Sequence, residues 1–396
     1  VQEESSRLPV RRTLSSGSTG SATKELHILS RELKELNQTW FRRVLVCSGG
    51  LQDHKGQGHL ATKVLLVMLG LIHVSVPPFL TSLFGFPISL VVVFFCCYLI
   101  FLIPAIFVRG NFLRSGLIQS LVDPSKHKHV LMHFDMECRL LVISLAGETL
   151  MLNTLCASLL LSIEFDRVEQ LFGSSRMLLV TIFPINAVLH FITVIIAKLL
   201  PVLLRMVCDV LAEDLQEFKR EVETLFLMGS TTQAGTTSAL HDELHLRECS
   251  LRLRLAASNE TIGPTVFAVA GSNLVMVMGM LLVLIHSIKL SVHPILCGCF
   301  AFLALNHSVW LVSMLRGVAR VGDGWSHIVE DLNTPALCTA TASVLSGVPL
   351  AERLGQLRYM GVTLFDCTIT SSTVSSVAFT LGSGLFLTAL GSGLML

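Results

Sequence analysis

Hydroxyl side chains crowd the last apolar run of the chain. Residues 368–376 read TITSSTVSS, and Ser383 and Ser392 follow. In lipid, polar side chains need partners or water. A face of hydroxyl groups suits a cation path, because hydroxyl oxygens partly replace the hydration shell of the ion. Small residues also allow close helix packing, and the residue types leave both interpretations open.

The same run carries acidic and aromatic groups that fit a pore. Asp366 at its start would concentrate cations if several copies formed a ring, or would favour a helix N-terminus. Large apolar groups further along would form constrictions that gate by dewetting. The candidate pore-lining residues are Asp366, Thr368, Ser372, Ser376, Phe379, Ser383 and Phe386.

Polar and ionisable side chains also interrupt the other apolar runs. Glu148 lies in the middle of one run and His190 in the next, so the two could pair with each other or bind a polar ligand. Hydrogen bonding between helices is the structural alternative. Together with residues chosen by depth in their runs, they give a candidate ligand pocket of Phe94, Glu148, Ser158, Asn186, His190, Met280 and Phe300.

Long apolar runs are the elements that must position these residues. Charged residues make up only 14% of the 396-residue chain and apolar residues 52%. Each run is long enough for a spanning helix, which needs about 20 apolar residues. The sequence therefore predicts an all-α polytopic membrane protein with seven transmembrane helices, at 60–83, 86–108, 139–163, 177–204, 262–288, 292–315 and 362–394.

The distribution of basic residues predicts an orientation. With the N-terminus in the cytoplasm, 25 of the 29 Lys and Arg residues fall on the cytoplasmic side. Short loops rich in Lys and Arg resist translocation. We therefore expect a multi-pass plasma-membrane protein with a cytoplasmic N-terminus and an extracellular C-terminus. Lys198, near the inner end of the fourth run, is expected to reach the interface.

The loops on the cytoplasmic side are the long ones. Residues 207–227 and 241–257 carry apolar residues at helical spacing and predict an antiparallel pair that extends spans four and five. We expect six segments: a cytoplasmic N-terminal part (1–59), helices 1–4 (60–204), helical extensions with a linker (205–261), helices 5–6 (262–315), cytoplasmic loop helices (316–361) and a pore-lining helix 7 (362–396).

Several function classes have no support in the sequence. There is no His-Glu-x-x-His site or other catalytic pair in a run, so we expect no enzyme activity and no cofactor. The eleven cysteines show no zinc spacing. A net charge of +1 does not indicate a nucleic-acid partner. The charge bias and the missing Asp-Arg-Tyr-like and Asn-Pro-x-x-Tyr motifs oppose a G-protein-coupled receptor.

Two stretches resemble insect gustatory receptors, in the gustatory and odorant receptor superfamily. Residues 251–275 resemble the entry to span five of that family, with Asn259 and Gly263 in place, and Ile262 where the family has an aromatic residue. Residues 361–372, GVTLFDCTITSS, resemble the entry to its last span. The family's closing Tyr and Gln are absent, because Phe379-Thr380 and Phe386-Leu387 stand at that spacing.

The resemblance implies a homotetrameric, ligand-gated, non-selective cation channel in the lipid bilayer. The last spans of four subunits would line one pore, and the inner ends of spans four to seven would form a cytoplasmic anchor domain. Each subunit would bind a small-molecule tastant or odorant. The assembly would be a homotetramer or a hetero-oligomer with related receptor subunits. A polytopic secondary transporter, or another seven-span protein without channel activity, is the alternative.

Overall fold

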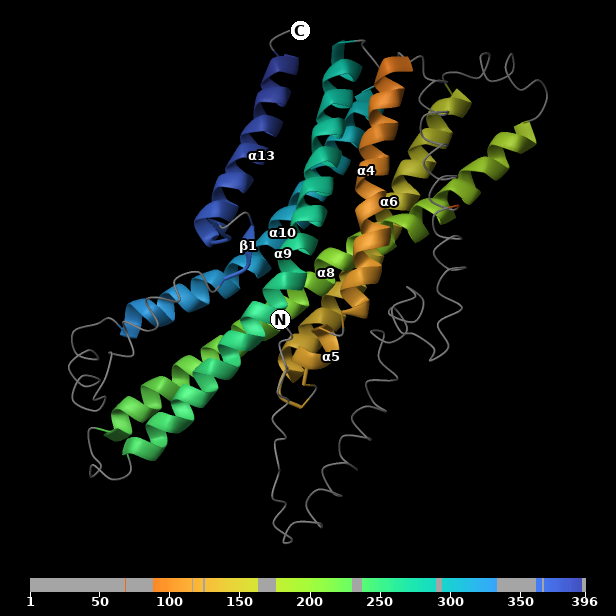
Figure 1. Ribbon diagram of the computed structural model, residues 1–396. Coiled ribbons are helices and arrows are strands. Elements are labelled where there is room, and N and C mark those ends of the chain that lie inside the picture. The colour runs from red at the N-terminus through yellow and green to blue at the C-terminus, as the bar shows by residue number, and fades with distance from the viewer. Residues whose placement is uncertain are drawn as a thin grey trace, which may run out of the picture.

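The computed structural model describes Met68 and residues 88–115, 117–123, 125–162, 176–229, 237–289, 294–332, 361–364 and 367–393. The predicted first span lies outside them, except for Met68. The described part is a bundle of long helices with a two-strand hairpin (Figure 1). Its elements are α4 (Ile88–Arg114), α5 (Leu117–Leu121), α6 (Lys128–Ser162), α8 (Arg176–Gly229), α9 (Thr237–Lys289), α10 (Pro294–Leu332), β1 (Thr363–Leu364), β2 (Cys367–Thr368) and α13 (Ser371–Gly393).

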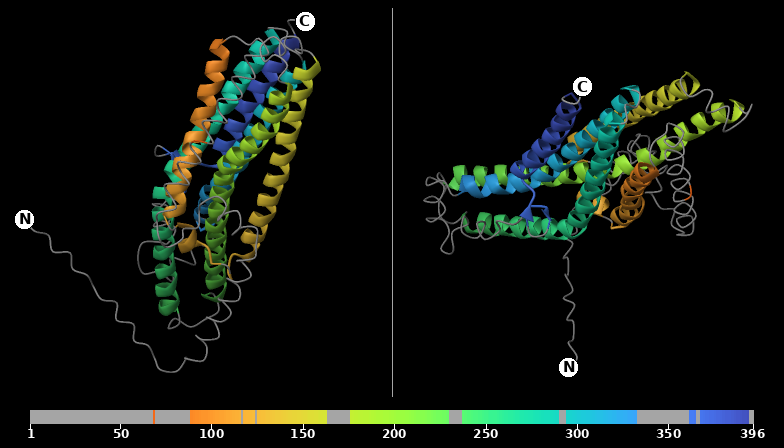
Figure 2. Two further views of the ribbon diagram at one scale, coloured as in Figure 1. Left: turned by 90° about the vertical axis from the view of Figure 1, so that its right-hand side faces the viewer. Right: turned by 90° about the horizontal axis from the view of Figure 1, so that it is seen from above.

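Two of these helices, α8 and α9, run far beyond the predicted spans. α8 joins the fourth span and the predicted helix at 207–227 without a break, and α9 does the same for 241–257 and the fifth span. Their extensions lie side by side and point away from the bundle (Figures 1 and 2). Each side of the span boundary has helical periodicity, so nothing in the sequence stops the helix there.

The described helices suit a membrane. Three are long and apolar enough to cross one, over Pro184–Thr224, Leu246–Lys289 and Cys297–Ile328. A shorter apolar helix covers Phe95–Arg109. Large apolar side chains also point outward, as Ile143 and Leu150 do on α6, with about two thirds of their surface exposed. Lipid can solvate such side chains, so this is a helical membrane protein.

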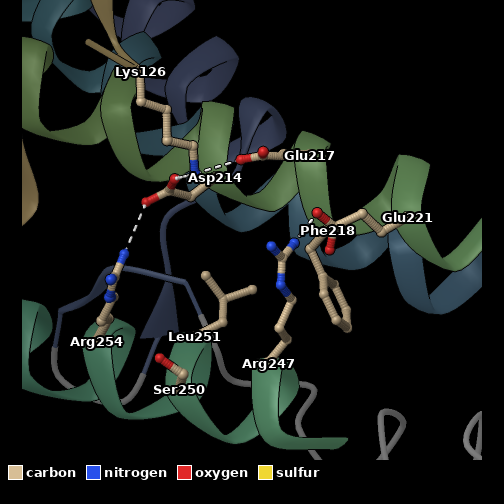
Figure 3. A pocket seen from close by; sticks show the side chains of 9 residues that line it. All are labelled: Lys126, Asp214, Glu217, Phe218, Glu221, Arg247, Ser250, Leu251 and Arg254. Carbon is tan, nitrogen blue, oxygen red and sulfur yellow. Dashed lines mark hydrogen bonds and ion pairs between the residues drawn. The ribbon is translucent and has the colours of Figure 1, made fainter. Parts of the chain in front are cut away.

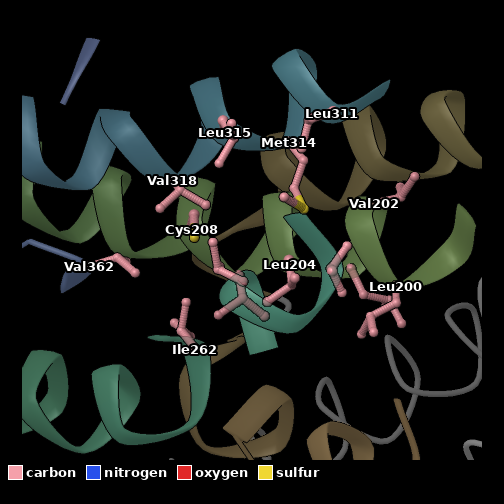
Figure 4. Packing of buried hydrophobic residues seen from close by; sticks show 14 of the residues in the cluster. Leu200, Val202, Leu204, Cys208, Ile262, Leu311, Met314, Leu315, Val318 and Val362 are labelled. Carbon is pink, nitrogen blue, oxygen red and sulfur yellow. The ribbon is translucent and has the colours of Figure 1, made fainter. Parts of the chain in front are cut away.

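The core lies where α8, α9 and α10 meet. Leu200, Leu204, Cys208 and Ile262 are fully buried there, with Met314 from α10 against them (Figure 4). Every turn of α8 in this region contributes apolar residues. Packing on several sides at once explains why the helix is apolar nearly all round between 199 and 211.

The last helix begins later than the sequence predicts. α13 starts at Ser371, whereas β1 and β2 before it form an antiparallel pair in which Thr363 lies opposite Thr368. Val362 and Thr368 therefore precede the helix, although the apolar run predicts both inside it. The backbone N–H of Ile369 donates to the Val362 carbonyl, so the hairpin satisfies backbone groups that a helix would otherwise pair.

Candidate functional site

A buried ion pair joins α6 and α8. Lys198 Nζ donates to Glu148 Oε2 at 3.0 Å, and the side chains are 3% and 1% exposed. The prediction that Lys198 reaches the interface is wrong, because its amine points into the bundle instead. Removing two charges from water is costly, and the cost is offset only when the charges meet. Each of these residues therefore explains the presence of the other.

Two further polar groups surround the Glu148 carboxylate. Asn306 Nδ2 of α10 donates to Glu148 Oε2, and His190 Nε2 of α8 lies 4.0 Å from Glu148 Oε1. The pairing of Glu148 with His190 that the sequence suggested is thus the longer of its two contacts to basic groups. We call Glu148, His190, Lys198 and Asn306 the interior cluster. It ties three helices together.

Amide and ring contacts continue the polar layer beside the interior cluster. Asn186 Nδ2 donates to Asn153 Oδ1 at 3.2 Å, linking α8 to α6. On another side, His307 Nδ1 lies 3.3 Å from Asn273 Oδ1 and its ring meets Phe101 edge-on, at 5.0 Å between centroids. In an apolar interior such contacts fix helix register.

The structure brings together only part of the predicted ligand pocket. Glu148 and His190 belong to the interior cluster, and Asn186 lies one turn before His190 on the same helix. Met280 and Phe300 are buried on α9 and α10 within the apolar core. The side chains of Phe94 and Ser158 lie outside the described residues. The pocket as a whole stays a prediction.

α13 has two distinct faces. Val374 and Leu381, seven residues apart, are buried against the bundle. Ser372, Ser376 and Phe379 lie on exposed parts of the helix, and Phe379 keeps 77% of its surface exposed. α13 stands at the edge of the bundle, where it contacts α10 and α9 (Figures 1 and 2). The hydroxyl-rich side therefore faces away from the other described helices.

The other predicted pore residues are less exposed or lie outside the described set. Ser383 is half-buried on α13, and Thr368 is half-buried on β2 before the helix begins. Asp366 and the side chain of Phe386 lie outside the described residues. Their role in a pore stays a prediction.

Two polar contacts hold the segment that leads into α13. Asn259 of α9 bonds Thr363 of β1 through both ends of its amide. Asp323 of α10 accepts hydrogen bonds from the backbone N–H and the hydroxyl of Ser371. Sequence reasoning missed Asp323. The signal that could have found it is an acidic residue between two glycines, at 322–324.

A polar hollow lies between the extensions of α8 and α9. Its volume is about 180 Å³ (Figure 3). Lys126 pairs with Asp214 and Glu217, Arg247 pairs with Glu221, and Arg254 Nη1 lies 3.7 Å from Asp214 Oδ2. The acidic and basic side chains of the hollow pair with each other. The hollow is therefore an ion-pair network that joins the turn before α6 to the extensions of α8 and α9. The lining residues are Lys126, Asp214, Glu217, Phe218, Glu221, Arg247, Ser250, Leu251 and Arg254.

The groups in this turn have shifted pKa values. Burial alone lowers the pKa of Lys126, but hydrogen bonds and attraction from Asp214 and Glu217 outweigh it and raise the pKa above 10.5. Hydrogen bonds from Ser125 lower the pKa of Asp123 below 3.8. Both groups therefore hold their charge at neutral pH.

Within the described part of the chain, no three His, Cys, Asp or Glu side chains gather in a way that could hold a metal ion. The described cysteines are free thiols.

No known family model matches the sequence, and no curated protein matches it. Similar chains do occur among solved structures. The chain is similar to an insect olfactory receptor. Two of the similar structures are those of the insect olfactory receptor OR5 from Machilis hrabei, one in complex with eugenol and one without it.

The structure with eugenol is 13% identical, with a TM-score of 0.46, and the match covers 89% of this chain and 97% of that one. The structure without it is 12% identical, with a TM-score of 0.44, and the match covers 88% of this chain and 97% of that one.

Proposed function

We propose that this chain is a chemosensory receptor subunit that forms a ligand-gated, non-selective cation channel with α13 lining the pore. The observation that carries the proposal is the exposed face of α13. Ser372 and Ser376 point away from the chain's own bundle, while Val374 and Leu381 hold the helix to it. A face of serines gains little from lipid and much from water or a passing cation.

Several copies of the chain would cover that face. A closed ring of four would bring four α13 helices around one axis, each showing its hydroxyl side to the others. The long extensions of α8 and α9 then provide a second contact region below the spans. We propose a homotetramer, or a mixed assembly with related subunits, in the plasma membrane with the N-terminus in the cytoplasm.

The proposed ligand is a small-molecule tastant or odorant, bound near the interior cluster. Glu148, His190, Lys198 and Asn306 offer donors and acceptors in a largely apolar bundle. Most small-molecule sites have this composition, an apolar wall with a few placed polar groups. The two stretches that resemble gustatory receptors, around Asn259 and Thr363, meet in space, which supports a shared architecture.

Whole-cell recording tests this proposal. Cells expressing the chain are exposed to a panel of sugars, alkaloids and phenols under ion substitution. We expect a cation current that Ser376→Trp abolishes. Val309→Trp is the matched control, because Val309 is an exposed apolar residue of α10, 58% exposed. It should leave the current intact at equal surface expression.

Two outcomes would overturn the channel. Stoichiometric uptake of a panel compound without conductance would favour the secondary transporter. A chain that runs as a monomer in mild detergent, and conducts no current in cells, would leave no shared pore.

A further inference from the structure

The start of α13 is held by a carboxylate from another helix. The backbone N–H of Ser371 donates to Asp323 Oδ1 at 3.2 Å, and the Ser371 hydroxyl donates to Asp323 Oδ2. The first N–H groups of a helix have no partner within it, and an acidic side chain there also complements the helix dipole. Here the capping group belongs to α10, so the cap is also a joint between two helices.

The backbones approach closely at the same joint. A Cβ atom on Gly322 would lie 2.7 Å from the carbonyl oxygen of Ile369, and the Gly361 site also lies directly against Gly322. No side chain separates the two backbones here, so neither segment can shift toward the other without moving its neighbour. The residues before α13 therefore follow any movement of α10 at this point.

α10 also reaches the interior cluster. Asn306 donates to Glu148, and α10 continues without a break from Pro294 to Leu332. Asn306 and Asp323 are 17 residues apart, which is about 25 Å along a helix at 1.5 Å per residue. A single rigid element thus touches the proposed ligand site at one place and the start of the proposed pore helix at another.

We propose that Asp323 is a positioning residue that couples α10 to the opening of the α13 pathway. Movement of α10 at the interior cluster reaches α13 through the hydrogen bonds of Asp323 to Ser371. The inference rests on the proposed function, since it assigns the regulation of that channel. Asp323 acts through Ser371 and does not contact the ligand or the ion.

A double-mutant cycle on the two residues tests the coupling. The compound of the panel that gives the largest wild-type current is applied to Asp323→Ala, Ser371→Ala and the double variant, with surface expression measured for each. Loss of a helix cap shifts an equilibrium by about fivefold, so we expect the concentration for half-maximal current to rise about fivefold in Asp323→Ala. The double variant should show no rise beyond that of Asp323→Ala, because the bond from the Ser371 hydroxyl is already lost in Asp323→Ala.

Two further variants separate coupling from general damage. Asp323→Asn keeps one acceptor oxygen and should restore most of the sensitivity. Arg316→Gln, at an exposed position two turns earlier on α10, should behave as wild type. Single-channel conductance should be unchanged in every variant, since Asp323 does not line the path.

Hydrogen–deuterium exchange at residues 371–376 gives a readout that needs no current. Exchange there should be at least fivefold faster in Asp323→Ala than in wild type, with Arg316→Gln unchanged. If wild type conducts nothing, the proposed function fails while this measurement still decides the joint. Unchanged exchange in Asp323→Ala, or additive effects of the two changes on the current, would overturn the inference.

Discussion

The side-chain amide of Asn259 forms two hydrogen bonds with Thr363, which lies 104 positions later in the sequence. Asn259 Oδ1 accepts from the Thr363 backbone N–H at 3.1 Å, while Asn259 Nδ2 donates to Thr363 Oγ1 at 2.8 Å. Gly263, one turn further along α9, leaves room for the Thr363 carbonyl, which would lie 3.0 Å from a Cβ atom. The two stretches singled out in the sequence thus form one contact, at the entry to α13.

Replacing Asn259 should destabilise the segment that leads into α13. Asn259→Ala leaves the Thr363 N–H and hydroxyl without this partner, at a cost of about 1–3 kcal/mol in a partly buried site. Thr363→Val removes only the hydroxyl bond and should cost about 1 kcal/mol. Thermal unfolding in detergent measures both. Glu260→Ala, next to Asn259 on the exposed side of α9, is the control, and a similar loss there would contradict the role of Asn259.

A methyl group at Gly322 should be harmful, whereas one at Gly298 should not. The Gly322 site lies against the Ile369 carbonyl, but nothing lies within 4 Å of the corresponding point at Gly298 on the same helix. Gly298→Ala should stabilise by up to about 1 kcal/mol, the difference in helix propensity. Gly322→Ala should destabilise by about 1–3 kcal/mol. The melting temperatures of Gly322→Ala and Gly298→Ala measure the difference. Equal values would count against a close approach of Gly322 to the Ile369 carbonyl.

The buried ion pair should show strong coupling between its members. Lys198→Met leaves the Glu148 carboxylate buried without its closest basic partner, a loss of about 3–5 kcal/mol, and Glu148→Gln leaves the amine in the same position. The double variant Glu148→Gln/Lys198→Met should regain much of the loss, because no buried charge remains. Folded yield and melting temperature in detergent measure it. Additive losses would mean that the two charges do not stabilise each other.

Lys126 should contribute stability that is lost in alkaline solution. Its pKa is raised in the folded chain, so the contribution is complete below pH 10.5 and disappears as the pH rises through the raised value. The side chain is 39% exposed, so solvent screening limits the effect to about 1 kcal/mol or less. Lys126→Gln should lower the melting temperature at pH 8, and the difference from wild type should narrow by pH 11. Lys128→Gln, also exposed, is the control, and a constant difference would argue against the ion pair.

Much of the architecture could be read from apolar periodicity alone. The runs predicted helices where α4, α6, α8, α9, α10 and α13 occur, because a chain in lipid must satisfy its backbone within each helix. The helical spacing at 207–227 likewise predicted the extension of α8. Boundaries were less predictable. The carboxylate that caps the helix start at Ser371 belongs to Asp323, 48 positions earlier, so no local pattern reveals that partner.

The sequence likewise predicted some residues of the candidate site and missed the contacts of others. Sequence alone identified Glu148 and His190 as polar groups out of place in lipid, and the serines of the last run as an unusual face. It misplaced Lys198, because an amine near a span end can equally reach water or a buried carboxylate, and only the position of α6 against α8 settles which.

The sequence by itself determined that the chain is helical, lies in a membrane and carries a hydroxyl-rich last helix, because these follow from composition and from periodicity within one segment. Tertiary structure decided which charge meets which, that Asn259 holds Thr363, and which side of α13 faces away from the bundle. Those relationships join residues that are far apart in the chain, and no local energy term specifies them. They depend on how the helices pack.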